Sequence, residues 1–106
     1  MAVHDGHRAR LREQLEKSGL DSFSDVQVLE LLLTFAIARQ DVNPLAHALL
    51  ERFGSLSAVL DAPEPELRKV PGVGEGAAAL LSLVPQLLRR YQLDRAHAAS
   101  VLDTRD

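Results

Sequence analysis

The stretch that decides the fold is LRKVPGVGEGAAALL, residues 67–81. Two glycines enclose one apolar residue, Val73, and an alanine-rich segment follows them. Gly72 and Gly74 let the main chain adopt conformations that other residues avoid, and they let it approach a ligand closely. Small side chains at residues 77–79 let two helices pack closely. The stretch therefore predicts a tight turn between two helices, with Val73 directed into the core.

The first turn of the second helix is a candidate anion site. Amides at the start of a helix have no partner within it and lie at the positive end of its dipole. Phosphate is the anion that best fits such a terminus. The carboxylate of Glu75 should repel a phosphate, whereas two basic residues precede the turn. The candidate phosphate-binding residues at this turn are Gly72, Val73, Gly74, Gly76, Ala77, Arg68 and Lys69.

The rest of the chain also has helical periodicity, and no segment alternates with the period of a strand. The second expected helix is apolar on nearly all sides, Phe35 included, which predicts the buried centre of the molecule. Pro85 predicts a kink in the last helix, because proline lacks the amide and clashes with the preceding turn. The expected helices span residues 7–18, 25–38, 44–52, 56–60, 64–69 and 75–91. The pattern indicates an all-α fold, a compact bundle of five to six helices over residues 1–92, with a tail or linker at 93–106.

Short polar residues and glycines mark the expected helix boundaries. Ser24, Asn43 and Ser55 are expected N-caps, because their side chains can accept hydrogen bonds from the first amides of a helix. Gly19 and Gly54 are expected to end the helices that precede them.

A degenerate internal repeat relates two parts of the chain. Residues 42–50 fall on residues 73–81 when the sequence is shifted by 31 positions. Each segment begins with an apolar turn residue and continues into a face of alanine and leucine. Residues 37–43 would then form a first, degenerate turn, and Pro44 directly after it lacks a donor amide. We expect this first turn to be structural and the second to be functional.

The bulk composition limits the classes of protein to consider. A length of 106 residues suits one domain, and the absence of cysteine excludes disulfides and thiolate metal sites. The net charge of −3 is not that of a strongly basic nucleic-acid binder. Residues 18–67 carry a net charge of −6, whereas residues 1–17 carry +1 and residues 68–106 carry +2. An anionic partner should therefore meet the ends of the chain.

The glycine turn with its flanking helices resembles the helix-hairpin-helix motif of sequence-independent DNA-binding proteins. In that family the turn amides bind one phosphate, and a basic residue just after the second glycine usually assists. Glu75 and Gly76 stand at that place here. The resemblance implies a tandem helix-hairpin-helix fold of the SAM-like (HhH)2 type with a degenerate first hairpin. It also implies weak, non-specific contact with the DNA backbone.

Five further stretches extend the resemblance over nearly the whole chain. They are GHRARLR at 6–12, SGL at 18–20, VLELLL at 28–33, PLA at 44–46 and RFGSL at 52–56. Together they resemble the N-terminal domain of the RadC-like (UPF0758) family. That resemblance implies an association with DNA repair and a following JAB/MPN-type domain similar to zinc metallopeptidases. The His-x-His pair of that domain is missing here, so we interpret the chain as a non-enzymatic N-terminal part, or as a protein that lacks the second half.

Two functions remain open. In the first, the domain binds the DNA backbone, and Arg8 and Arg12 of the first helix either contact phosphate or form a solvated helix face. In the second, the domain is a protein-interaction or dimerisation scaffold that pairs with a second copy or docks on the JAB/MPN-like domain. The acidic middle of the chain and Glu75 favour the second function.

Other polar residues carry no chemistry of their own in this interpretation. No metal or other cofactor is expected, because His4 and His7 supply too few ligands for zinc. Glu30, the one acid in the apolar helix, is expected at the surface or paired with Arg39 or Arg52. The polar N-terminus and the short apolar runs predict a cytoplasmic protein without a membrane partner.

Overall fold

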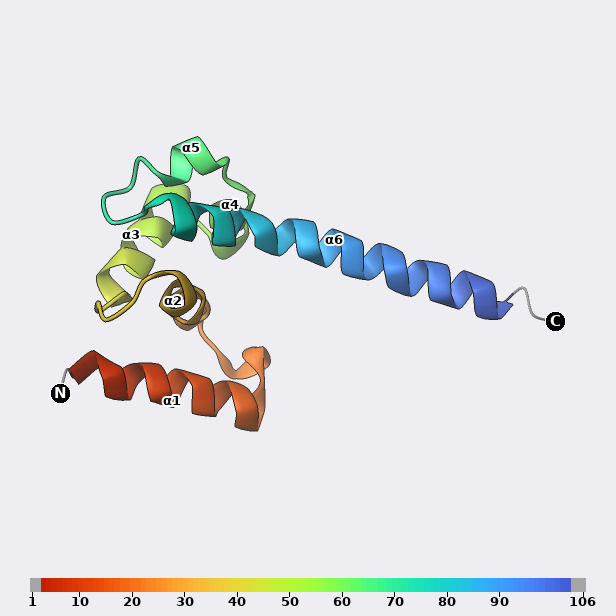
Figure 1. The fold of residues 1–106 in the computed structure, drawn as a ribbon, viewed down its shortest axis with the longest axis horizontal. Coiled ribbons are helices and arrows are strands. Elements are labelled where there is room, and N and C mark those ends of the chain that lie inside the picture. The colour runs from red at the N-terminus through yellow and green to blue at the C-terminus, as the bar shows by residue number, and fades with distance from the viewer. Residues whose placement is uncertain (1–2, 104–106) are drawn as a thin grey trace.

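The computed structural model describes residues 3–103, and this part of the chain is helical with no strand (Figure 1). Side chains are described from residue 6 to residue 101. The elements are α1 (Val3–Ser18), the 3-10 turn η1 (Leu20–Ser22), α2 (Asp25–Ala36), α3 (Asn43–Phe53), α4 (Leu56–Asp61), α5 (Glu64–Leu67) and α6 (Glu75–Asp103). The all-α prediction is therefore confirmed.

Most of the predicted helix boundaries are confirmed. Ser24 Oγ accepts a hydrogen bond from the amide of Gln27 at 3.2 Å, and Gln27 Oε1 accepts one from the Ser24 amide at 3.0 Å. This reciprocal pair caps the start of α2. Ser55 caps α4 through its hydroxyl alone, which accepts a hydrogen bond from the Ala58 amide at 3.1 Å. Gly54 ends α3 with a φ of 98°, and Gly19 follows the last residue of α1.

The N-cap prediction at Asn43 is wrong. Val42 is the N-cap of α3, and Asn43 is the first helical residue. The Asn43 side-chain amide instead donates to Glu30 Oε2 at 3.1 Å, and His7 Nε2 donates to the same oxygen at 2.9 Å. The surface position expected for Glu30 is also wrong, because this residue is only 2% exposed. Two polar side chains satisfy its buried carboxylate, which would otherwise be costly to bury.

The core lies where α2, α3, α4, α5 and the first turns of α6 meet. Its buried side chains include Leu29, Leu33, Val42, Ala46, Leu49, Val59, Leu67, Val70, Val73, Ala77, Ala78 and Leu81. Val73 is only 6% exposed, so its predicted place in the core is confirmed. Phe35 is 62% exposed, which corrects the expectation that every apolar residue of α2 is buried. The Arg12 guanidinium lies 5.2 Å from the centroid of the Phe35 ring and partly covers it.

The last helix is longer than predicted, because α6 continues past Tyr91 to Asp103. Residues 92–103 contain neither glycine nor proline and are rich in alanine and leucine. Their helix propensity sustains the helix even though the apolar stripe weakens. The helix also continues through Pro85 without a break. Residues 104–106 of the predicted tail lie outside the described range, and a linker role for this segment stays a prediction.

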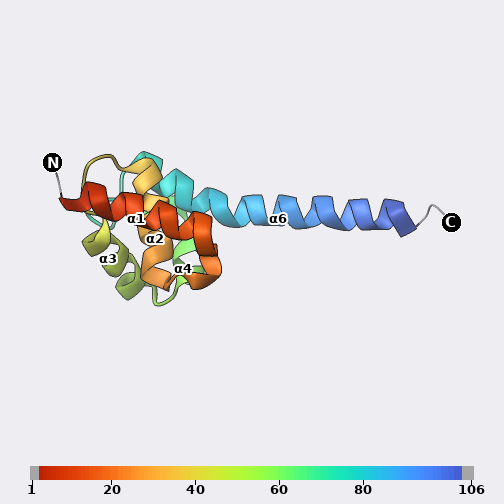
Figure 2. The same ribbon diagram turned by 90° about the horizontal axis from the view of Figure 1, so that it is seen from below.

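The molecule consists of a bundle and a projecting helix (Figures 1 and 2). The first turns of α6 pack against α2, α4 and α5. The part of α6 after Pro85, here called the arm (residues 86–103), leaves the bundle, and the molecule measures 59 × 34 × 21 Å. Within residues 3–103, no helix combines the length and the apolar character needed to cross a membrane.

Candidate nucleic-acid interface

The turn between α5 and α6 is fixed by main-chain hydrogen bonds and one buried side chain. The Val70 amide donates to Leu67 O at 3.1 Å, and the Val73 amide donates to Val70 O at 3.0 Å. Gly72 has a φ of 99°, in the left-handed region that strains any residue with a side chain. Val73 anchors the turn in the core, while the glycines on either side of it are exposed. The outer edge of the turn is therefore both held in position and accessible.

The first three amides of α6 lack an acceptor within the helix; the residues Glu75 and Gly76 are exposed, whereas Ala77 is only 3% exposed. Ala78 is the first residue whose amide donates within this helix, to Gly74 O at 3.0 Å. The amides of Glu75, Gly76 and Ala77 precede it and bond to no acceptor in the described part of the chain. Gly74 occupies the N-cap position and has no side chain that could cap them. These donors lie at the positive end of a long helix, so they can bind an oxyanion.

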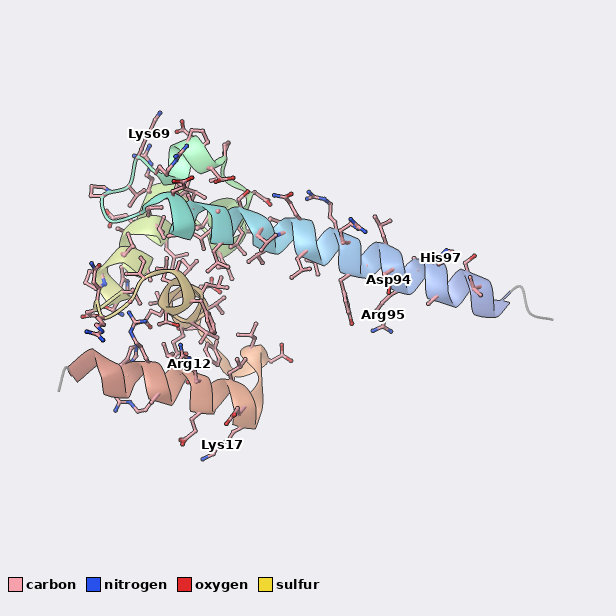
Figure 3. The ribbon with its side chains drawn as sticks, viewed as in Figure 1. Arg12, Lys17, Lys69, Asp94, Arg95 and His97 are labelled. Atoms are coloured by element: carbon pink, nitrogen blue, oxygen red, sulfur yellow. The ribbon has the colours of Figure 1, made fainter. Side chains whose placement is uncertain are left out.

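The charges beside the turn nearly balance. Lys69 Nζ lies 2.8 Å from Glu66 Oε2. The hydrogen bond and charge of Lys69 hold the pKa of the Glu66 carboxyl below its ordinary value. Figure 3 shows Lys69 directed outward from the connection between α5 and α6. Arg68 is exposed without an ion pair among residues 3–103. The exposed Glu75 carboxylate offsets its positive charge. Any attraction for an anion at this turn must therefore come mainly from the amides.

Sequence reasoning missed one basic residue near the turn, Arg52 of α3. Arg52 lines an open hollow of about 440 Å³ together with Val70 and Pro71. Its guanidinium lies 3.9 Å from Glu66 Oε1, rather than beside Glu30 as one expectation had it. No periodicity links Arg52 to the glycine turn, because the two come together only when α3 packs beside α5.

The structure does not bring the Arg8 and Arg12 side chains to the turn. Both lie on α1, which Figure 1 places on the far side of α2 from α5. The Arg8 guanidinium donates to three main-chain carbonyls, those of Thr34 at 3.1 Å, Ile37 at 2.8 Å and Gln40 at 2.7 Å. Its charge therefore caps the C-terminal end of α2, where the helix dipole favours a cation. Arg12 is exposed and rests on a ring of α2, as Figure 3 shows for its position between α1 and α2.

The structure offers little for metal chemistry in the described part of the chain. Among residues 3–103, no three His, Cys, Asp or Glu residues gather as a set that could hold a metal ion. His7 is engaged with Glu30, and the side chain of His4 lies outside the described residues.

Fold and turn together define a class of protein: a small all-helical domain with two successive helix–turn–helix pairs, α2–α3 and α5–α6, and a long final helix that leaves the bundle. Residues 6–79 match the family model described as UPF0758 N-terminal. The chain belongs to the UPF0758 family, the RadC-like family that its sequence resembles.

A curated relative supports this membership. The chain is 39% identical over 84 residues to UPF0758 protein FN0909 of Fusobacterium nucleatum subsp. nucleatum. The match covers 79% of this chain and 36% of the relative, so the chain spans about a third of the length of that protein. No solved structure matches the chain.

Proposed function

We propose that this domain binds the DNA backbone weakly and without sequence preference through the turn between α5 and α6. We interpret α2–α3 and α5–α6 as tandem helix-hairpin-helix units, the first of them degenerate, in a RadC-like protein associated with DNA repair. The proposal assigns the chain no catalytic role. The observation that carries it is the set of amides without an acceptor at Glu75, Gly76 and Ala77. They follow Gly72, whose backbone φ is positive.

In this function one phosphate oxygen accepts hydrogen bonds from the open amides. Arg68 is the cation best placed to add charge, since Lys69 and Arg52 both pair with Glu66, at 2.8 Å and 3.9 Å. Contacts to phosphate position a protein on DNA but carry no base information, so the binding is sequence-independent. With one or two phosphates neutralised, the logarithm of the association constant falls against that of salt with a slope of about −1 to −2.

The sharpest test replaces Gly74 by aspartate. A side chain at Gly74 meets nothing within 4 Å, so the substitution fits the fold. An Asp carboxylate at the N-cap would accept hydrogen bonds from the same amides that the phosphate needs. We expect Gly74→Asp to abolish binding of labelled duplex and single-stranded DNA at low salt while it slightly stabilises the domain. Gln92→Glu adds one negative charge on the exposed arm of the same helix and serves as the control.

A second variant tests the proposal by an expected increase in DNA affinity. Glu75→Lys removes the opposing carboxylate and adds a cation beside the amides. We expect binding to tighten roughly tenfold at low salt and the salt slope to steepen by about one. Glu16→Lys makes the same charge change at an exposed position on α1 and should have little effect. Absence of binding at low salt, or binding that ignores Gly74→Asp, would exclude the proposed function.

The arm of α6 favours a second function, a protein-interaction scaffold. Leu87, Leu88 and Tyr91 are 62%, 52% and 56% exposed, which is unusual for large apolar side chains that share one helix face. Such a surface would serve dimerisation or docking on the JAB/MPN-like domain that the family resemblance implies. Light scattering of the chain, alone and mixed with that domain from a longer family member, separates the two partners.

A further inference from the structure

We propose that the arm of α6 pairs antiparallel with the arm of a second copy of this chain. The inference deepens the scaffold function by naming its partner. It is independent of DNA binding, because the open amides lie at the opposite end of α6 from the arm.

The contact surface is a shallow, open apolar groove on one face of the helix, and Arg95 projects from the same face. Val84, Leu87, Leu88 and Tyr91 line a hollow of about 370 Å³. Their spacing of three, four and seven residues from Val84 places them on the same side of an α-helix. Leu93 is 65% exposed as well, but it lies on the opposite face. The groove is therefore an oriented stripe, whereas Leu93 is an isolated apolar residue.

This groove continues a face that is already buried in the bundle. Ala77 and Leu81 begin the same stripe and are 3% and 0% exposed. Val84 also closes one side of an apolar cavity of about 340 Å³ between α6 and the bundle. The other residues of that cavity are Leu20, Val28, Leu31, Leu32, Leu56 and Leu60. The bundle thus covers the first half of a continuous apolar stripe, whereas the second half is exposed at Leu87 and Leu88 and is contacted by Arg95 at Tyr91.

The charges on the arm fit a second copy of the same helix. Arg90 and Asp94 lie one turn apart on one flank of the stripe, and Figure 3 shows Asp94 on the arm. In an antiparallel pair with its two-fold axis near Tyr91, Arg90 of each copy faces Asp94 of the other. The symmetry repeats this ion pair, as an isologous contact requires. One flank of the helix therefore supplies both partners of the charge match, Arg90 and Asp94.

Arg95 lies on the stripe itself, where its side chain contacts Tyr91 of the same helix. Its guanidinium lies 5.9 Å from the centroid of the Tyr91 ring, and its Nη1 donates to Tyr91 Oη at 3.2 Å. This bond folds the side chain along the helix, so that its methylene groups can cover apolar surface while the charge stays in water.

The shape of the molecule favours antiparallel over parallel pairing. Packed helices lie about 8–10 Å apart. The bundle is much wider than that, since the second-longest dimension of the molecule is 34 Å. Parallel arms would place both bundles at the same end, where they would overlap. Antiparallel arms place the bundles at opposite ends, and the end of each arm then approaches the apolar cavity beside Val84 of the other copy.

Sedimentation equilibrium of the whole chain over a hundredfold range of concentration tests the pairing. We expect a reversible dimer, and we expect Leu87→Glu combined with Leu88→Glu to weaken it at least about a hundredfold through loss of apolar burial. Both residues are exposed, so the bundle should keep its thermal stability. The control is Leu93→Glu, which places one such charge on the opposite face and should leave the dimer unchanged.

Charge reversal tests the register and direction of the pair. Asp94→Arg places like charges opposite each other at two symmetric points, and we expect it to weaken the dimer roughly tenfold. Adding Arg90→Asp to it exchanges the two charges and should restore the dimer. Because the chain lacks cysteine, a mixture of Val84→Cys and Ala98→Cys chains should cross-link under oxidation, whereas Val84→Cys alone should not.

The proposal is overturned by a monomer at every concentration, which would leave the groove to a different protein. It is equally overturned by a dimer that withstands the paired glutamates, since that dimer would use another surface. Neither result bears on the DNA titration, so the two proposals fail separately.

Discussion

The two helix–turn–helix pairs of this domain share an apolar pattern but treat their polar groups in opposite ways. Val42 and Val73 hold equivalent places in the repeat and are 4% and 6% exposed. At the connection between α2 and α3, however, other side chains occupy the polar groups. Arg8 donates to the carbonyls of Thr34, Ile37 and Gln40 in and after the last turn of α2. Asp41 Oδ1 accepts a hydrogen bond from the Asn43 main-chain amide at the start of α3 at 3.0 Å.

The connection between α5 and α6 lacks this internal support. Its amides at Glu75, Gly76 and Ala77 have no acceptor in the described chain, and its glycines carry no capping side chain. The comparison teaches that an apolar repeat sets the fold of both pairs, whereas the polar residues decide which turn is closed. A turn whose main-chain groups bond mainly to side chains of the same molecule is structural, and an open turn has donors to offer a ligand.

Arg8→Leu should break the closed turn with the largest effect. The substitution leaves three carbonyls at the end of α2 without their donor and removes a cation from the C-terminal end of the helix dipole. We expect a loss of about 2–4 kcal/mol in the free energy of unfolding, measured by urea denaturation. Arg12→Leu, one turn further along the exposed side of α1, should cost much less. Equal losses of unfolding free energy in the two variants would mean that the three Arg8 hydrogen bonds contribute little to stability.

Glu30→Leu should open the same turn from the other side, with a somewhat smaller effect. The change leaves the side chains of His7 and Asn43 without their shared acceptor, Glu30 Oε2. Each of them retains some contact with solvent, so we expect a loss of about 1–3 kcal/mol. Glu30→Gln keeps an acceptor at this place and should lose less than Glu30→Leu in the same denaturation experiment. The reverse order would show that apolar packing outweighs the hydrogen bonds.

Much of the fold could be predicted because its signals are local. The caps at Ser24 and Ser55 follow from short polar side chains next to the helices that they begin. The burial of Val73 follows from its place between two glycines in a turn that must pack on the core. The family match over residues 6–79 confirms the resemblance that was drawn from short motifs.

The remaining features depend on contacts that local patterns do not encode. Asn43 has the right type and position for an N-cap, but a carboxylate on α2 offers its side chain a better partner. In the sequence, Arg8 resembles part of a basic helix face. In the fold, α2 ends beside Arg8, and the guanidinium donates to carbonyls there. The open amides were predictable from the glycine turn, whereas the nearness of Arg52 depends on how α3 packs.

Gly72→Ala should distort the open turn with a moderate effect. The φ of 99° at Gly72 is costly for alanine, although a Cβ there would meet only Leu45 at 3.5 Å. We expect a loss of about 1–2 kcal/mol and weaker binding of DNA. Gly76→Ala is the matched change and should instead stabilise the domain. A Cβ at Gly76 meets nothing within 4 Å, and alanine favours the helix over glycine by about 1 kcal/mol. Differential scanning calorimetry should therefore show one variant melting below the parent chain and the other above it.

The Glu66–Lys69 ion pair beside the open turn should have the smallest effect, visible only as pH dependence. The Lys69 hydrogen bond and charge lower the pKa of the Glu66 carboxyl in the folded chain below its ordinary 4.5. The pair therefore stabilises the fold above that ordinary value, and the stabilisation is lost as the pH falls through the lowered one. Solvent screens this exposed pair, so its contribution is small.

Lys69→Met removes the ion pair, and thermal unfolding of both chains at several values between about pH 7 and pH 3 measures the consequence. We expect the parent chain to melt slightly above the variant near neutral pH and the two to converge in acid. Arg10→Met removes an exposed cation from α1 and should show a flatter difference across the same range. A gap that widens on acidification would contradict the direction of the Glu66 pKa shift, and Lys69 would then be as available to a phosphate as Arg68.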